Sequence, residues 1–236
     1  MSYMFRYLTH PQVNQDPKVP VPRWGLSDIG KARLLALKST RELINTRLVI
    51  SSTETKAIET AEVISELFGA AHIARENMHE NDRSATGYLP PQEFEQTADA
   101  FFLKPHQSVR GWETAIDAQE RVFEAFQAIT KEHADSDLLF VGHGGVGTLL
   151  LCRLLNLPIA RLHDQPAGGG NYFVGQLENH QVSQRWQPAK KCARGGKRHT
   201  HDIVNKRNRC TGTAAPSVFL RPPADGRRRR KQANRL

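Results

Sequence analysis

The chain has 236 residues, a length that suits one large domain or two small ones, and 39% of them are hydrophobic. Its net charge of +9 is unevenly distributed, with +13 in residues 187–236 and −4 in residues 1–186. No apolar run is long enough to cross a bilayer, and no N-terminal stretch has the pattern of a signal peptide. We therefore expect a cytoplasmic protein without membrane contact, whose three cysteines cannot form a fully paired disulfide framework.

The N-terminal part predicts a strand, a loop and a helix. Residues 5–9 are β-prone, and the run ends at His10, which a proline follows at once. Residues 11–24 are proline-rich, which excludes a regular helix or a central strand there. Ser27 is a suitable N-cap for a helix whose apolar positions continue to about Asn45.

A second strand-and-helix unit follows. Residues 47–51 form a β-branched run that predicts a strand, and residues 51–53 end it and can cap the next helix. Gly69 is expected to stop that helix. A short strand is predicted at 71–74, before a polar loop that is rich in turn residues at 79–91.

The remaining chain continues the alternation of helices and strands. Residues 137–142 are apolar throughout, as expected for a strand that is covered on both faces. The alternation predicts an α/β fold with three layers, α/β/α, around a mostly parallel sheet in a single domain of residues 1–186. The other predicted elements are helices at 92–103, 113–133 and 146–155 and a last strand at 171–177.

Two predicted strands end in a histidine: His10 follows the first, and His143 follows the strand at 137–142. The carboxyl ends of parallel strands meet at one edge of a sheet, so we expect the two imidazoles to lie close together. Gly144 and Gly145 let a bound group approach the backbone, and the helix that begins there offers N–H groups to an anion.

Further polar residues complete a predicted phosphate pocket. Ser52 and Lys56 lie at the next strand-to-helix junction, and Thr9 precedes His10. Glu80, in the polar loop, is a candidate proton donor to a leaving group. Taken singly, each feature has an ordinary alternative: a tight turn, a routine cap or a solvated side chain. Their combination favours the pocket.

These motifs resemble those of the histidine phosphatase superfamily, which includes the cofactor-dependent phosphoglycerate mutases, over about residues 4–177. The family's Ser-Ser-Pro-x-x-Arg-Ala-x-x-Thr-Ala is similar to residues 51–61, and its late Gly-His-Gly to residues 142–144. Its Leu-Thr-x-x-Gly-x-x-Gln-Ala is similar to the first half of residues 26–34. Its opening Arg-His-Gly is Thr9-His10-Pro11 here.

The resemblance implies a phosphoglycerate mutase-like fold and a phosphoric monoester hydrolase of the histidine phosphatase type. His10 would accept the phosphoryl group as a phosphohistidine. His143, Lys56 and backbone N–H groups, with Gly144 among them, would hold the phosphate oxygens. Glu80 would protonate the leaving oxygen and then activate water. Neither a metal nor another cofactor is expected, and the expected ligand is a small-molecule phosphate ester.

The sequence departs from the family at two phosphate-clamping arginines, which correspond to Thr9 and Lys56. Threonine has no charge, and lysine cannot form the planar two-pronged contact. Losing one such donor typically costs about 10²–10³ in rate, so activity could be low. We predict that Arg83, in the same loop as the candidate acid, takes over the guanidinium role; Arg6 and Arg110 are weaker alternatives.

Two further interpretations stay open. A catalytically weak pseudo-phosphatase would bind a phosphorylated ligand or partner without turning it over.

The composition of residues 187–236 predicts a disordered basic arm, with a run of basic residues at 227–231, and nucleic acid is expected to bind only there. The alternative is that this arm is a solvated extension with no role. No oligomeric state is predicted for the protein. A zinc site is not favoured by the spacing of Cys192, His199, His201 and Cys210.

Overall fold

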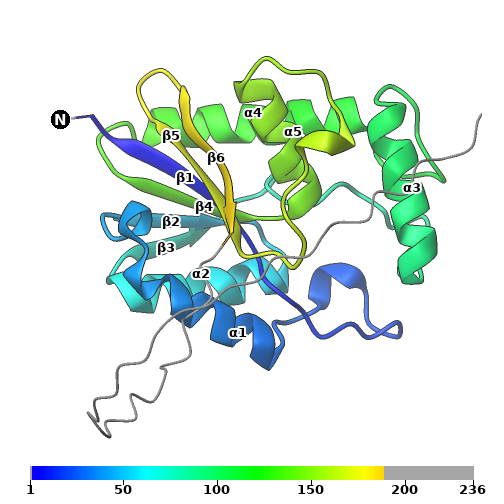
Figure 1. Ribbon diagram of the computed structural model, residues 1–236, viewed down its shortest axis with the longest axis horizontal. Coiled ribbons are helices and arrows are strands. Elements are labelled where there is room, and N and C mark those ends of the chain that lie inside the picture. The colour runs from blue at the N-terminus through cyan, green and yellow to red at the C-terminus, as the bar shows by residue number, and fades with distance from the viewer. Residues whose placement is uncertain (1, 189–236) are drawn as a thin grey trace, which may run out of the picture. The chain divides into compact units, whose positions relative to one another are not determined.

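The computed structural model describes residues 2–188, and it confirms the predicted α/β fold (Figure 1). A six-stranded sheet with the order β3-β2-β4-β1-β5-β6 forms the middle layer. The first four strands of the chain are parallel: β1 (Met4–Thr9), β2 (Leu48–Ser51), β3 (Ala71–Ala74) and β4 (Leu138–Gly142). The last two run antiparallel to their neighbours at one edge: β5 (Asn171–Gln176) and β6 (Val182–Pro188).

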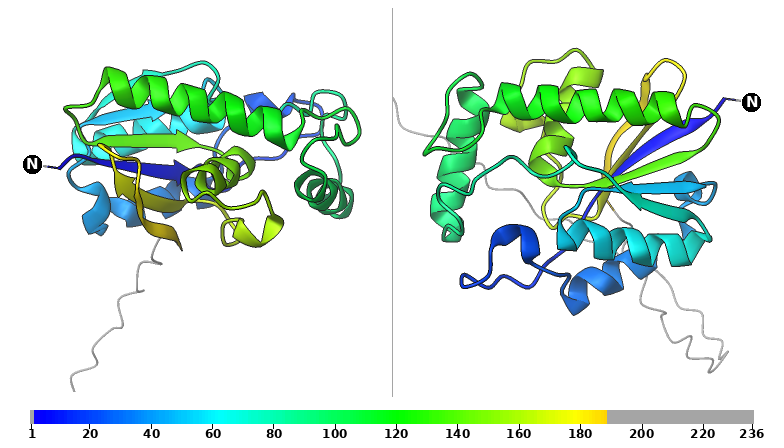
Figure 2. Two further views of the ribbon diagram at one scale, coloured as in Figure 1. Left: turned by 90° about the horizontal axis from the view of Figure 1, so that it is seen from above. Right: turned by 180° about the vertical axis from the view of Figure 1, so that it is seen from behind.

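Helices cover both faces of the sheet. Figure 1 shows α1 (Asp28–Leu35) and α2 (Thr55–Phe68) on one side and α4 (Ala115–Glu132) and α5 (Gly144–Leu154) on the other. Helix α3 (Pro91–Leu103) stands at one end of the molecule, beyond the sheet (Figure 2). None of the helices within residues 2–188 has the length and apolar character needed to cross a membrane.

The core has two parts because the central strands send alternate side chains to opposite faces. Phe5 and Tyr7 of β1 belong to the core cluster on the α4 side, where the rings of Phe5 and Phe126 are 5.0 Å apart. Leu8 belongs to the other cluster, together with Ala57 of α2. Since both faces of β1 are buried, the end of this strand is held in place for the residues that follow it.

The first predicted helix is shorter than expected. Ser27 caps it as predicted, its Oγ accepting from the N–H of Gly30, but α1 ends at Leu35 instead of Asn45. Two short 3₁₀ helices, Ala36–Ser39 and Arg41–Leu43, follow it. A 3₁₀ helix has three residues per turn, so residues that are three positions apart lie on the same side of it. The buried residues with this spacing are Leu34, Leu37, Thr40 and Leu43.

Helix α2 begins and ends close to the predicted positions. Its N-cap is Glu54 and not one of residues 51–53, because the Ser52 hydroxyl bonds to His143 and to the N–H of Glu54 instead. Gly69 ends the helix with φ 65°, a left-handed conformation that glycine adopts without a steric penalty.

The sequence did not predict β6, which extends two residues past the expected domain limit at 186. Its residues are mostly polar, with Val182 and Trp186 among the few apolar ones, and its partner β5 supplies the pairing that defines it. The predictions for a basic arm and for a zinc site concern residues that lie, apart from the end of β6, outside the described part of the chain.

Candidate active site

The structure brings His10 and His143 together at the carboxyl ends of β1 and β4. These strands are parallel neighbours, with Thr9 opposite Gly142, and the N–H of His10 donates to the Gly142 carbonyl at 2.9 Å. The two imidazole centroids are 5.2 Å apart with an angle of 67° between the rings. The expected meeting of the two strand ends is therefore present in the fold.

His10 is a neutral ring in a fixed tautomer. Its Nδ1 lies 2.8 Å from the carbonyl oxygen of Pro11, which can only accept, so Nδ1 carries the hydrogen and Nε2 keeps a lone pair. Burial and the nearby charge of Lys56 lower the pKa of His10 to about 4. Near neutral pH the ring is therefore uncharged, which is the state that a nucleophilic imidazole requires.

A glycine-rich loop holds the backbone of His10 from the other side. Gly169 has φ 66°, and a Cβ on it would lie 2.4 Å from the carbonyl oxygen of His10. The N–H of Gly170 donates to the carbonyl of Thr9 at 3.1 Å. This close approach requires glycine, so the loop supports the strand end and is not only a flexible connection.

His143 lies completely buried at the start of α5. Its Nε2 is 2.7 Å from Ser52 Oγ and 3.5 Å from Glu54 Oε1. The Tyr7 hydroxyl accepts from the N–H of His143 at 3.1 Å and donates to its carbonyl at 3.2 Å. Burial lowers the pKa of His143 to about 3, so this imidazole is also neutral.

Lys56 points into the site, but a carboxylate already pairs with it. Its Nζ forms an ion pair with Glu54 Oε2 and donates to the Val21 carbonyl at 2.9 Å. Burial alone would raise the pKa of Glu54, but the charge and hydrogen bond of Lys56 and the N–H of Glu80 hold it below its usual range. Sequence reasoning missed Glu54, which occupies a variable position of the resembling motif; an acid two residues before the expected cation was the available signal.

Glu80 covers the start of α5. Its carboxylate accepts from the N–H groups of Gly145 at 3.0 Å, Val146 at 2.9 Å and Asn81 at 3.1 Å. The predicted anion site at this helix start is therefore filled by a carboxylate of the chain itself. A Cβ on Gly145 would lie 2.6 Å from Glu80 Oε1, so this glycine makes room for the acid.

Thr9 and Gly144 both lie next to the side-chain amide of Gln165, and Thr9 also contacts Asn171. The Thr9 hydroxyl donates to Gln165 Oε1 at 2.7 Å and accepts from the N–H of Asn171 at 3.1 Å. A Cβ on Gly144 would lie 2.4 Å from Gln165 Nε2. Thr9 lines neither of the cavities described below, since Gln165 and Asn171 engage its hydroxyl. Sequence reasoning missed Gln165, for which an irregular loop provides no pattern.

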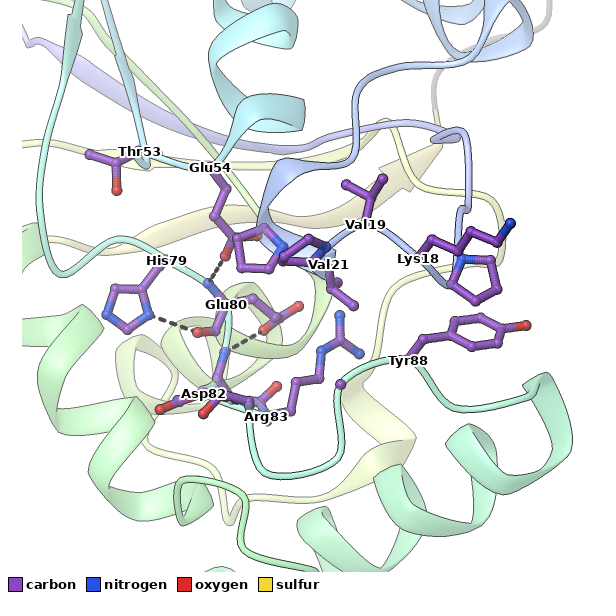
Figure 3. Close-up of a pocket in the computed structure, with 16 residues that line it drawn as sticks. Lys18, Val19, Val21, Thr53, Glu54, His79, Glu80, Asp82, Arg83 and Tyr88 are labelled. Carbon is purple, nitrogen blue, oxygen red and sulfur yellow. Dashed lines mark hydrogen bonds between the residues drawn. The ribbon is translucent and has the colours of Figure 1, made fainter.

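Two neighbouring cavities open over this edge. The smaller, of about 300 Å³, is lined by His10, Lys56 and Arg83 among others. The larger, of about 680 Å³, is lined by Glu54, Glu80 and Arg83 among others (Figure 3). Both cavities share Arg83, so this side chain lines the cavity of the predicted nucleophile and also that of the predicted acid.

Arg83 is held mainly by aromatic rings. Its guanidinium carbon is 5.0 Å from the ring centroid of Phe94, and within residues 2–188 its buried Nε has no hydrogen-bond partner. The alternatives lie elsewhere: Arg6 pairs with Asp137 at 2.7 Å, and Arg110 pairs with Glu93 at 3.3 Å. Of the three candidate guanidinium groups, the structure therefore brings Arg83 alone into the cavities.

The less exposed charged groups at this edge balance. Two cations, Lys56 and Arg83, accompany two carboxylates, Glu54 and Glu80, around two neutral imidazoles, whereas Lys18, Asp82 and Glu95 line the cavities at exposed positions. Within the described residues no group of three or more His, Cys, Asp or Glu side chains is arranged to hold a metal ion. The chemistry that this arrangement supports uses an imidazole nucleophile, a carboxyl acid and fixed positive charge, as phosphoryl transfer requires.

The three-layer α/β fold places two histidines and an acid together at the carboxyl edge of its sheet. Residues 18–186 match the family model of the histidine phosphatase superfamily (branch 1), and the chain belongs to this superfamily. The match begins at residue 18 and does not cover His10. No curated protein matches the sequence.

Solved structures share the fold at low sequence identity. A mycobacterial glucosyl-3-phosphoglycerate phosphatase is 18% identical, with a TM-score of 0.63 over 79% of this chain and 97% of that one. Bacillus stearothermophilus YhfR is 19% identical, with a TM-score of 0.65 over 79% and 97%. A putative alpha-ribazole-5'-P phosphatase from Escherichia coli is 15% identical, with a TM-score of 0.61 over 80% and 97%.

Proposed function

We propose that the protein hydrolyses a small-molecule phosphate monoester through a phosphohistidine intermediate on His10. The observation that supports this most directly is the Nδ1–H of His10 donating to the Pro11 carbonyl, which leaves the Nε2 lone pair for attack. The position of His10 in one cavity with Lys56 and Arg83 supports the same role, because both side chains can donate to phosphoryl oxygens and the charge of Arg83 complements a phosphoryl group. A cytoplasmic setting and a nucleic-acid contact through residues 187–236 alone are further parts of this proposal.

The reaction proceeds in two displacements. First, His10 Nε2 forms a bond to phosphorus as the bond to the leaving oxygen breaks, and protonated Glu80 delivers its proton to that oxygen. Water then attacks the phosphohistidine while ionised Glu80 takes the water proton, and the lone pair returns to Nε2. The amides of Gly145 and Val146 donate to the Glu80 carboxyl group and hold it in position for both steps.

The other site residues hold the oxygens or support those that do. Arg83 supplies the guanidinium, and Lys56 and the Gly144 amide are the further proposed donors. The Ser52 hydroxyl positions the ring of His143, with which it forms a hydrogen bond. The proposed role of Thr9 is indirect: its hydroxyl donates to the side-chain amide of Gln165 and orients it.

The test is the detection of acid-labile phosphate on the protein after mixing with a generic aryl phosphate. We expect it in the wild type and in the surface variant His106→Ala, and we expect none in His10→Ala. Hydrolysis by the wild type with no phosphoprotein, or an equal signal in His10→Ala, would contradict the mechanism.

A second candidate is a pseudo-phosphatase that binds a phosphorylated ligand or partner without turning it over. The ion pair between Glu54 and Lys56 favours it, because this carboxylate competes with phosphate for the cation. It predicts saturable binding of inorganic phosphate and no turnover of any phosphate ester, with no phosphohistidine formed.

A further inference from the structure

We propose that Glu54 sets the charge preference of this site, so that a phosphoryl-like group with one negative charge binds in preference to the dianion. The inference deepens the proposed function and rests on it for the position of the phosphoryl group. It is supported by the placement of both Glu54 oxygens and by the balance of buried charges around them.

Glu54 is the N-cap residue of α2, but its side chain does not cap the helix. One oxygen pairs with the ammonium of Lys56, and the other accepts from the N–H of Glu80 at 2.9 Å. The side chain is 8% exposed and that of Lys56 is 2% exposed. A helix-capping role therefore does not explain this carboxylate, which is directed into the site and lines the larger cavity (Figure 3).

The pair removes Lys56 from the charge that is free to bind phosphate. The ammonium has an ionic partner in Glu54 and a second acceptor in the Val21 carbonyl. His10 and His143 are neutral rings. The remaining charged side chains that line the two cavities are exposed: Lys18 and Asp82 are opposite in sign, and Glu95 pairs with Arg161. The charge available inside the site therefore depends on Arg83 and Glu80.

The paired charges favour a monoanion. With Lys56 balanced by Glu54 and Arg83 offset by Glu80, the site has no excess positive charge, so each negative charge on a ligand is added without compensation. A dianion therefore leaves one more uncompensated negative charge than a monoanion does, which is unfavourable in a partly buried site. Without the Glu54 carboxylate, Lys56 would contribute one positive charge, whose attraction for a dianion is twice that for a monoanion.

The experiment compares two non-hydrolysable ligands of the same shape, benzenesulfonate with one charge and phenylphosphonate, which is mostly a dianion at about pH 8. The measurement is the dissociation constant of each for the full-length protein. We expect the wild type to bind benzenesulfonate more tightly. Glu54→Gln should tighten phenylphosphonate binding by about tenfold or more, because one buried charge is removed beside the ligand, and leave benzenesulfonate within a factor of about three.

Glu66→Gln is the matched control, because it makes the same charge change at an exposed position of α2. The inference is overturned if the wild type prefers phenylphosphonate or binds neither ligand. It is also overturned if Glu66→Gln tightens phenylphosphonate binding as much as Glu54→Gln does. A phosphohistidine on His10 together with a dianion preference means that the inference alone fails. A sulfonate preference without a phosphohistidine means that the proposed function alone fails.

Discussion

Lys56 and Arg83 both place a positive charge in the cavity that contains His10, but their surroundings differ. Lys56 is bonded to Glu54 and to the Val21 carbonyl, whereas the Arg83 Nε has no partner among the described residues. The aromatic ring of Phe94 supports the guanidinium without neutralising its charge. Arg83 is therefore the cation that a phosphate group meets with the least competition.

Replacing Arg83 by alanine should lower kcat/KM for an aryl phosphate by about 10²–10³, because a charged donor to the phosphoryl oxygens is lost. Arg83→Lys should recover only part of this, since an ammonium cannot form the two-pronged contact. Steady-state kinetics measure the effect. Arg110→Ala, whose guanidinium pairs with Glu93, is the control and should leave kcat/KM unchanged. Normal turnover and phosphate binding in Arg83→Ala would exclude the role.

At the scale of elements, the start of α5 and the loop that contains Glu80 form one unit. The helix offers the amides of Gly145 and Val146, and the Glu80 carboxylate accepts from both. Arg121 of α4 donates to the carbonyls of His79 at 3.1 Å and Glu80 at 3.3 Å, so a second helix holds the same loop. The position of the acid thus depends on contacts from two helices on one face of the sheet.

Gly145→Ala should displace Glu80, because the new Cβ would lie 2.6 Å from its Oε1. We expect kcat to fall by about tenfold or more, within the range that general acid–base catalysis contributes. Gly69→Ala is the control: a Cβ there meets open space, but the left-handed backbone makes alanine unfavourable, so it should cost about 1 kcal/mol of stability without changing kcat. Kinetics and urea unfolding separate the two effects, and an unchanged kcat in Gly145→Ala would refute the linkage.

At the scale of the whole molecule, burying neutral histidines couples folding to pH. The pKa of His10 is about 4 and that of His143 about 3 in the fold, below the usual value of 6.5. Between these values the unfolded chain binds more protons, so lowering the pH favours unfolding. The contribution of both rings is complete above about pH 6.5 and is lost as the pH falls toward 4.

We therefore expect the free energy of unfolding to decrease below about pH 6.5 by about 1 kcal/mol per pH unit for each of these histidines. Urea unfolding at several pH values measures it. His143→Gln should flatten the slope even if it lowers stability overall, and His106→Gln, at an exposed position, should not. An equal slope in wild type and His143→Gln would show that the buried ring is not responsible.

Local patterns were sufficient for most of the fold. Strands β1 to β5 and helices α2 to α5 lie within a few residues of their predicted positions, since apolar periodicity and turn residues act over short distances, whereas α1 ends ten residues before the predicted Asn45. The antiparallel direction of β5 and the existence of β6 were not predictable in the same way. A polar segment such as β6 becomes a strand only when a neighbour supplies the backbone partners.

The sequence by itself determined that His10 and His143 follow strands, and parallel pairing of β1 with β4 then brings them together. Tertiary structure alone decided which distant polar groups bond to each other: Glu54 to the N–H of Glu80, and Thr9 to Gln165. The physical reason is that strand ends are local features, whereas the partner of a buried charge or hydroxyl depends on segments that are distant in the chain. Glu54 belongs to the second kind, and its contacts are what the proposed charge preference rests on.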